Sequence, residues 1–139
     1  MKDGFDVVTD VSALLRVQPI TSQLGVGGNI FPDFRPDGRA DKIDIVVNTT
    51  GIINSQMQIG YANVNIYKPA VTVGGKAQAD QAGLRSLCKL VQPYLDGIWA
   101  HSFHTEIEEA GQIERDTDGS YFANITVKYY SLNTEFKNI

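Results

Sequence analysis

The sequence predicts an α+β fold with a mainly antiparallel sheet of about five strands, on three observations. A short stripe of apolar residues at helical spacing opens the chain, and a longer stripe occupies residues 80–98. Between and after these stripes lie β-forming runs, some of which alternate between apolar and polar residues. Turn residues separate the runs. The expected order is therefore helix, three strands, helix and two strands, with the long helix packed on one face of the sheet.

Length and composition are those of one globular domain, residues 1–139. The chain is 42% hydrophobic and 20% charged, which is ordinary for a folded soluble protein. No repeat or low-complexity tract divides it. The core is expected within about residues 5–132, and residues 133–139, which have no hydrophobic period, are expected to form a loose tail.

The first helix is predicted over residues 5–16. Its apolar residues recur at intervals of three and four, and they are Phe5, Val8, Val11, Leu14 and Leu15. Gln18-Pro19 should end it, because a residue before proline is disfavoured in the α conformation.

Two strands follow a glycine-rich connector at residues 25–28. The first, 29–34, contains Pro32, which cannot donate to a sheet ladder, so it should lie at an edge. Residues 35–42 carry charges of both signs around a Pro-Asp-Gly turn and are expected in water. Residues 43–48 are apolar enough for a central strand.

The third strand, 58–67, alternates clearly. Ala62, Val64 and Ile66 should face the core, and the opposite face should carry Tyr61, Asn63, Asn65 and Tyr67. Lys68-Pro69 should end the strand, and the stretch through Gly75 is expected to be a loop.

The long helix is predicted from Asp80, as its N-cap, to Ile98. Its stripe comprises Leu84, Leu87, Cys88, Val91, Leu95 and Ile98. Pro93 removes one backbone hydrogen bond and should kink or restart the helix. The last two strands, 103–113 and 121–132, are joined by a turn that contains Asp118-Gly119.

Charge and cysteine content restrict the partners. The net charge is −4, so neither bulk nucleic-acid binding nor attachment to an anionic membrane is expected. Cys88 is the only cysteine, so no internal disulfide can form. The acidic start of the chain is unlike an export signal, and no apolar run is long enough for a membrane span. We therefore expect the protein in the cytoplasm, with no membrane or sequence-specific nucleic-acid partner.

No motif predicts catalysis, a cofactor or a metal site. His101, His104, Glu106 and Glu108 are the nearest approach to a metal cluster, but a solvated strand face explains them better. Glu108, Glu109 and Glu114 are expected to be exposed, which disfavours acid–base work. Cys88 lies on an apolar stripe, as a buried thiol does. The glycines at 25–28 lack the strand-then-helix context of a phosphate loop. We therefore expect that the protein is not an enzyme.

The polar sheet face is the more informative feature. Tyrosine and asparagine alternate on the third strand, and Phe122 and Tyr130 lie on the corresponding face of the last strand. Such a mixture suits a wet protein–protein interface. Partial cover of this face by the first helix or by loops is the alternative.

The order of these segments resembles that of the tail-completion and tail-terminator proteins of long-tailed bacteriophages and prophages. The resemblance covers about residues 5–132 and rests on the short first helix, the strands Asn29–Phe34, Ile43–Asn48 and Tyr61–Tyr67, the long helix and the closing hairpin. It implies a structural protein without catalytic residues. It also implies a ring, commonly of six copies, that caps the tail tube and joins it to the head. Copies of the chain, tail-tube proteins and head-connector proteins would then be its partners, first in the host cytoplasm and later in the virion tail.

Within that resemblance, the edge strand and the exposed aromatics are the expected subunit contacts. The candidate interface residues are Ile30, Phe31, Phe34, Tyr61, Asn63 and Tyr67. The candidate lumen or partner loop carries Arg35, Asp37, Arg39 and Lys42. Two alternatives stay open, namely a small ferredoxin-like binding module or enzyme with a pocket between sheet and helix, and a conjugation or secretion-apparatus subunit.

Overall fold

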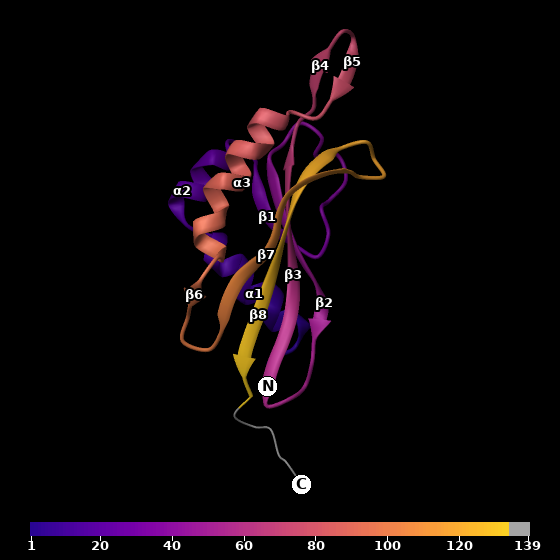
Figure 1. Ribbon diagram of the computed structural model, residues 1–139. Helices are drawn as coiled ribbons and strands as arrows, with labels where there is room; N and C mark the ends of the chain where they lie inside the picture. The colour runs from indigo at the N-terminus through magenta and orange to yellow at the C-terminus, as the bar shows by residue number, and fades with distance from the viewer. Residues whose placement is uncertain (134–139) are drawn as a thin grey trace.

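The computed structural model describes residues 1–133 and has an α+β architecture. A curled, mostly antiparallel sheet of six strands carries its helices on one face (Figure 1). The strand order is β1-β2-β3-β8-β7-β6. The predicted class is confirmed, but the predicted count of about five strands and the predicted order of elements are not.

Two long strands form the centre of the sheet. β3 (Met57–Lys68) pairs with β8 (Tyr121–Leu132) over their whole length, and β2 (Asp44–Ile52) and β7 (His104–Arg115) flank this pair. The alternation predicted for β3 is confirmed, since Ala62, Val64 and Ile66 are fully buried. Ile125, Val127 and Tyr129 of β8 extend the same core.

The strand β1 (Asn29–Pro32) lies at an edge of the sheet, as predicted for residues 29–34. Its parallel pairing with β2 was not predicted. A parallel neighbour requires the chain to return to the starting end of the strand. Residues 33–43, the crossover loop, make that return. The loop is folded over the sheet by ion pairs described below.

The N-terminal helix α1 (Gly4–Leu15) begins with a capping box between Asp3 and Asp6. Val7, Val8, Val11 and Leu15 are its buried apolar residues, whereas Phe5 is 80% exposed. The stripe therefore starts later than predicted. Pro19 does not stop helical structure, because it lies in the first turn of a second short helix, α2 (Gln18–Thr21), which continues into the 3₁₀ turn η1 (Ser22–Leu24).

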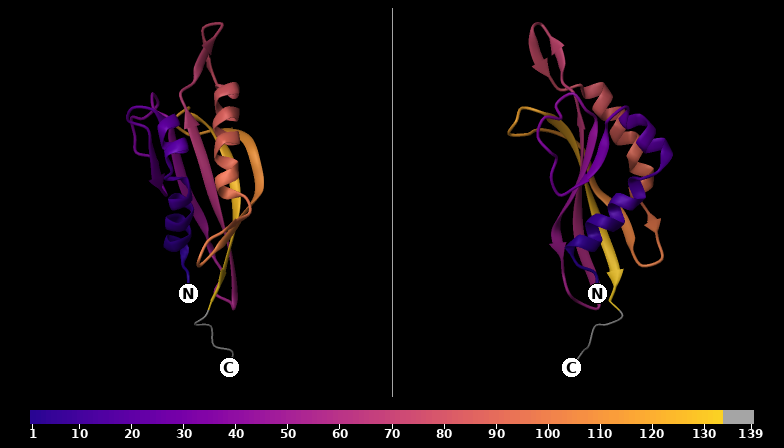
Figure 2. Two further views of the ribbon diagram at one scale, coloured as in Figure 1. Left: turned by 90° about the vertical axis from the view of Figure 1, so that its left-hand side faces the viewer. Right: turned by 180° about the vertical axis from the view of Figure 1, so that it is seen from behind.

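The long helix α3 (Gln81–Leu95) lies beside α1 on the same face of the sheet (Figure 2). Asp80 is its N-cap, as predicted, and accepts a hydrogen bond from the Gly83 N–H at 3.0 Å. Pro93 lies in the last turn of the helix, which ends at Leu95. Ile98 therefore falls outside the helix, in the two-residue strand β6 (Ile98–Trp99).

The stretch between β3 and α3 is a β-hairpin rather than the predicted loop. β4 (Val71–Val73) and β5 (Lys76–Gln78) pair around Gly74-Gly75, whose φ angles of 59° and 79° suit a two-residue hairpin turn. Residues 71–78, the arm, project beyond the end of the sheet (Figure 1).

The predicted loose tail is wrong at its first residue. Asn133 is buried, and its backbone N–H bonds to the Gln56 carbonyl at 2.8 Å. Residues 134–139, the remainder of that prediction, lie outside the described part of the chain. No helix within residues 1–133 is long and apolar enough to cross a membrane.

Candidate interaction surface

One face of the sheet carries no helix within the described part of the chain, and we call it the open face. Alternate residues of β3 and β8 point to it, because their neighbours are buried beneath α1 and α3. Among the side chains that these two strands place there, Lys128 is the only charged one. The others are amides, a threonine, aromatic residues and, at the end where β3 begins and β8 ends, aliphatic residues. This composition is unusual for a face in water.

Four asparagines form a hydrogen-bonded row across the middle of the open face. The Nδ2 of Asn63 donates to the Oδ1 of Asn48 at 3.1 Å, and the Nδ2 of Asn124 donates to the Oδ1 of Asn65 at 2.7 Å. A longer contact of 3.4 Å joins Asn124 to Asn63. The amide row thus links β2, β3 and β8 through side chains that are half-buried. Each amide retains further donor or acceptor capacity for an outside partner.

Aromatic residues continue the open face toward β6. The Tyr130 hydroxyl donates to the Oε1 of Glu106 at 2.8 Å, and the Tyr130 ring stacks with the His104 ring at a centroid distance of 5.6 Å. Trp99 stacks on the other side of His104 at 3.8 Å and is 82% exposed. Together with Met57 and Leu132, also exposed, these rings border a depression of about 580 Å³. An exposed tryptophan over a rigid ring stack is typical of a protein-contact residue.

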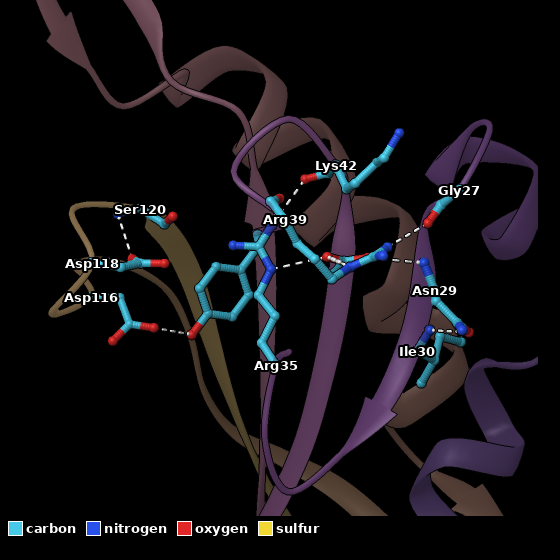
Figure 3. Close-up of polar contacts among 11 residues, drawn as sticks. Gly27, Asn29, Ile30, Arg35, Arg39, Lys42, Asp116, Asp118 and Ser120 are labelled. Carbon is cyan, nitrogen blue, oxygen red and sulfur yellow. Dashed lines mark hydrogen bonds and ion pairs between the residues drawn. The ribbon is translucent and has the colours of Figure 1, made fainter. Parts of the chain in front are cut away.

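The crossover loop covers the opposite end of the open face and is fixed to Asp44. This carboxylate is fully buried and accepts hydrogen bonds from the Nε of Arg35 at 2.9 Å and from the Nε and Nη2 of Arg39, each at 2.7 Å. The Asn29 N–H adds a bond of 3.0 Å, which also ties β1 to β2. Figure 3 shows the two arginines converging from the loop. One buried anion therefore holds both the crossover loop and the edge strand.

The electrostatics of this cluster follow from its contacts. Burial alone would raise the pKa of Asp44, but the hydrogen bonds from Arg39, Arg35 and Asn29 outweigh it, so the pKa lies below its ordinary value. The same carboxylate raises the pKa of Arg39. At neutral pH the cluster therefore contains one anion and two cations.

Tyr67 joins the cluster to the β7–β8 hairpin. The Arg35 guanidinium lies over its ring at 4.3 Å from the centroid, and Phe122 packs beside it at 5.0 Å. Its hydroxyl donates to the Oδ2 of Asp116 at 2.7 Å (Figure 3). Burial and this bond raise the pKa of Tyr67, and the same bond lowers the pKa of Asp116. The crossover loop and the turn between β7 and β8 therefore both contact Tyr67 at this end of the open face.

The structure divides the predicted interface residues into two groups. Ile30 is 3% exposed within the core, and Tyr67 is 6% exposed beneath Arg35, so neither side chain is accessible to a partner. Phe34 is 83% exposed, whereas Tyr61 and Asn63 are half-buried on the open face. Phe31 is half-buried, with the Arg39 guanidinium 4.9 Å from its ring centroid.

The predicted loop residues divide in the same way. The expectation that all their charges lie in water is wrong for Arg35 and Arg39, whose side chains are only 7% and 20% exposed. Their attraction to buried Asp44 turns them inward. Asp37 is exposed, and Lys42 is half-buried near Asp41 at 3.7 Å.

The residues weighed for chemistry are scattered. Glu108 lies at a bulge in β7, so it does not alternate regularly with His104 and Glu106, whose Nε2 and Oε2 atoms are 3.7 Å apart. Within residues 1–133, no group of three or more His, Cys, Asp and Glu side chains is placed to hold a metal ion. Cys88 is buried, as predicted, and Glu109 and Glu114 are exposed. His101 is exposed, and the glycines of 25–28 connect η1 to β1.

Sequence reasoning missed Asp44, Asp116, Trp99 and the arm. Asp44 left a visible signal, since it is the single acidic residue in the run Ile43–Val47 and follows a loop with two arginines. The Gly74-Gly75 pair between β-forming residues was a signal for the arm.

Comparison with protein-family models and with curated protein sequences found no match.

Proposed function

We propose that the chain is a structural virion protein of a long-tailed phage or prophage. In this proposal it caps the tail tube as a homo-oligomeric ring, for example a hexamer, and joins the tube to the head. Tail-tube and head-connector proteins are its neighbours. It has no catalytic role, acts without a cofactor, and is made in the host cytoplasm before it enters the virion tail.

The observation that carries the proposal is the open face. Tyrosine and amide side chains gather there. Within residues 1–133, Lys128 is the only charged residue that the two central strands, β3 and β8, place on this face. Interfaces are enriched in tyrosine and depleted of charge at their centre in the same way. The amide row holds its side chains in one conformation, which reduces the entropy lost on binding.

Two further features support a subunit with neighbours on several sides. The arm lies at one end of the molecule and the Trp99 ring stack at the other (Figures 1 and 2). A protein between a tail tube and a head needs a contact at each end, in addition to contacts around its ring.

A ligand-binding module or enzyme is the competing proposal, because a groove of about 650 Å³ lies between α3 and β7. Binding sites of that class combine an apolar wall with a few buried polar groups that converge on the ligand. Here the charged residues at the groove, Arg85 and Lys89, are exposed on α3. This arrangement favours a protein contact over a small-molecule site.

The proposal is tested in particle assembly. Deletion of the gene from the encoding phage or prophage should give tails of uncontrolled length or tails without heads. Tyr61→Asp should reproduce the defect, because it adds a charge beside the amide row without altering the core. Thr9→Asp, on the exposed side of α1, is the matched control and should assemble normally. Normal infectious particles from the complete deletion would refute the proposal.

A further inference from the structure

The arm is a strand pair that places no side chain in the core of its own subunit. Every residue from Val71 to Gln78 is exposed, and Val71 and Val73, which share one face of the hairpin, are 39% and 54% exposed. A two-stranded hairpin alone in water is only marginally stable. Two valines on the exposed face of such a hairpin are therefore better explained by a binding partner than by folding.

The root of the arm is fixed, so the arm has a defined direction. The Nζ of Lys68, at the end of β3, lies 2.7 Å from the Oδ2 of Asp80, the N-cap of α3. This ion pair bridges the two chain segments from which the arm emerges. The arm points away from its own sheet in all three views (Figures 1 and 2). It therefore holds Val71 and Val73 away from the core of its own subunit.

A surface with a free strand edge, suited to bind the arm, lies on the side of the same chain. β6 pairs only with His104 and Thr105, so within residues 1–133 the outer edge of β7 beyond Ile107 has no strand partner. The groove between this edge and α3 has a floor of Leu84, Cys88 and Ala123, and small residues of β7, Ala110 and Gly111, form its outer wall.

The shape of this edge limits what can pair with it. Bulges interrupt β7 between Ile107 and Glu109 and between Ala110 and Gln112, so beyond Ile107 the regular stretch of this edge is Gln112–Arg115. Bulged edges resist long strand pairing. A three-residue strand such as β4 or β5 fits the regular stretch, whereas a long strand does not.

Apolar contact supports the same pairing. Ile113, 37% exposed at the groove, pairs with buried Ala123 and therefore lies on the groove side of β7. Val71 and Val73 share one face of the arm, which places both valines on the side that meets Ile113.

We infer that the arm of one copy binds the groove between α3 and β7 of a second copy. It adds a short strand to Gln112–Arg115 and places Val71 and Val73 against the groove. The contact joins two different surfaces, so it is heterologous and closes into a ring when the rotation between copies permits. The inference rests on the proposed self-assembly and names the contact that makes it.

Disulfide trapping tests this contact in the full-length chain with Cys88→Ala as background. One variant carries Thr72→Cys on the arm, and another carries Gln112→Cys on the edge of β7. Mixed and mildly oxidised, the two should give a cross-linked dimer, whereas either alone should give few cross-links. A chain with both substitutions should give a ladder of covalent oligomers. Val73→Asp should abolish the ladder, and Val26→Asp, at a residue 97% exposed elsewhere, should not.

Two outcomes would overturn the arm contact. Equally strong cross-linking of Thr72→Cys alone would show that arms bind arms. No cross-link in the mixture, at the highest protein concentration attainable, would show that the arm does not reach the groove or binds a different protein. Light scattering on the same samples separates the two proposals, since association without cross-links leaves self-assembly intact. The particle-assembly test remains an independent measure of the proposed function.

Discussion

Asp44 should be the most sensitive polar position in the chain. Its carboxylate is fully buried and is the common acceptor for Arg35, Arg39 and the Asn29 N–H. Asp44→Asn keeps the size of the side chain but removes its charge and turns an NH₂ group toward the two guanidinium groups. The asparagine keeps one acceptor oxygen, so the hydrogen bonds made by the other oxygen are lost and the remaining ones lose their anionic acceptor. The Arg35 guanidinium, 7% exposed, is left without its anion.

The magnitude follows from the burial of the partners. Breaking a buried ion pair by removing one partner costs about 3–5 kcal/mol. Here the cost is lower, because Arg39 can turn toward water, so we expect a loss of about 2–4 kcal/mol in the free energy of unfolding at pH 7. In urea this corresponds to a midpoint lower by roughly 1–2 M.

The pH dependence gives a second measurement. The pKa of Asp44 is lower in the folded protein than in the unfolded chain, where it is about 3.9. Its stabilising contribution is therefore present above about pH 4 and is lost as the pH falls through the folded pKa. The difference between wild type and Asp44→Asn should shrink on acidification below pH 4.

Urea unfolding followed by circular dichroism measures both effects. Asp41→Asn is the control, because Asp41 is 76% exposed and should change stability little. The triple variant Asp44→Leu, Arg35→Met, Arg39→Met removes the unpaired charges and should recover part of the loss. A loss below about 0.5 kcal/mol for Asp44→Asn would refute the assignment of Asp44 as the anchor of the crossover loop.

Four other changes have distinct expected outcomes. Leu87→Ala in α3 should cost about 2–5 kcal/mol in urea unfolding, as for a buried leucine, and a cost under half a kcal/mol would place it outside the core. Tyr129→Phe removes the hydroxyl that bonds to Asp10 at 2.5 Å and should cost about 1–3 kcal/mol by the same measurement. Ser12→Ala should be neutral or stabilising by up to about 1 kcal/mol, because the buried Ser12 hydroxyl has no hydrogen-bond partner among residues 1–133. Replacing residues 70–78 by a short glycine-serine turn should leave the melting temperature unchanged and abolish self-association in light scattering.

Periodicity located most of the fold. The alternation around Ala62–Ile66 and the stripe of α3 gave the correct buried residues, because a half-buried strand and a surface helix repeat at fixed intervals. The C-terminal end of α3 was missed, since Ile98 continues the helical spacing although Leu95 ends the helix. Periodicity cannot distinguish an apolar residue just beyond a helix from one inside it.

Sequence reasoning was weaker for the site. Tyr61 and Asn63 were placed correctly on the open face, because their side was set by local alternation. Tyr67 follows the same alternation but is buried, because Arg35 and Asp116 reach it from distant segments. Such cover depends on where a loop folds back, which the spacing of residues within one strand does not encode.

The position of β8 in the sheet has a consequence for folding. β8 is the last strand in the chain, yet it lies between β3 and β7, and its register pairs Met57 with Leu132. During synthesis β3 therefore cannot pair with β8 until residue 132 has been translated, and the apolar side chains of β2 and β3 stay partly uncovered until then. Contacts this distant in sequence slow folding and leave strand edges open. A chain truncated before Tyr121 would lack the middle of its sheet and should aggregate, so translation to the end of β8 is the step that commits the domain to its fold.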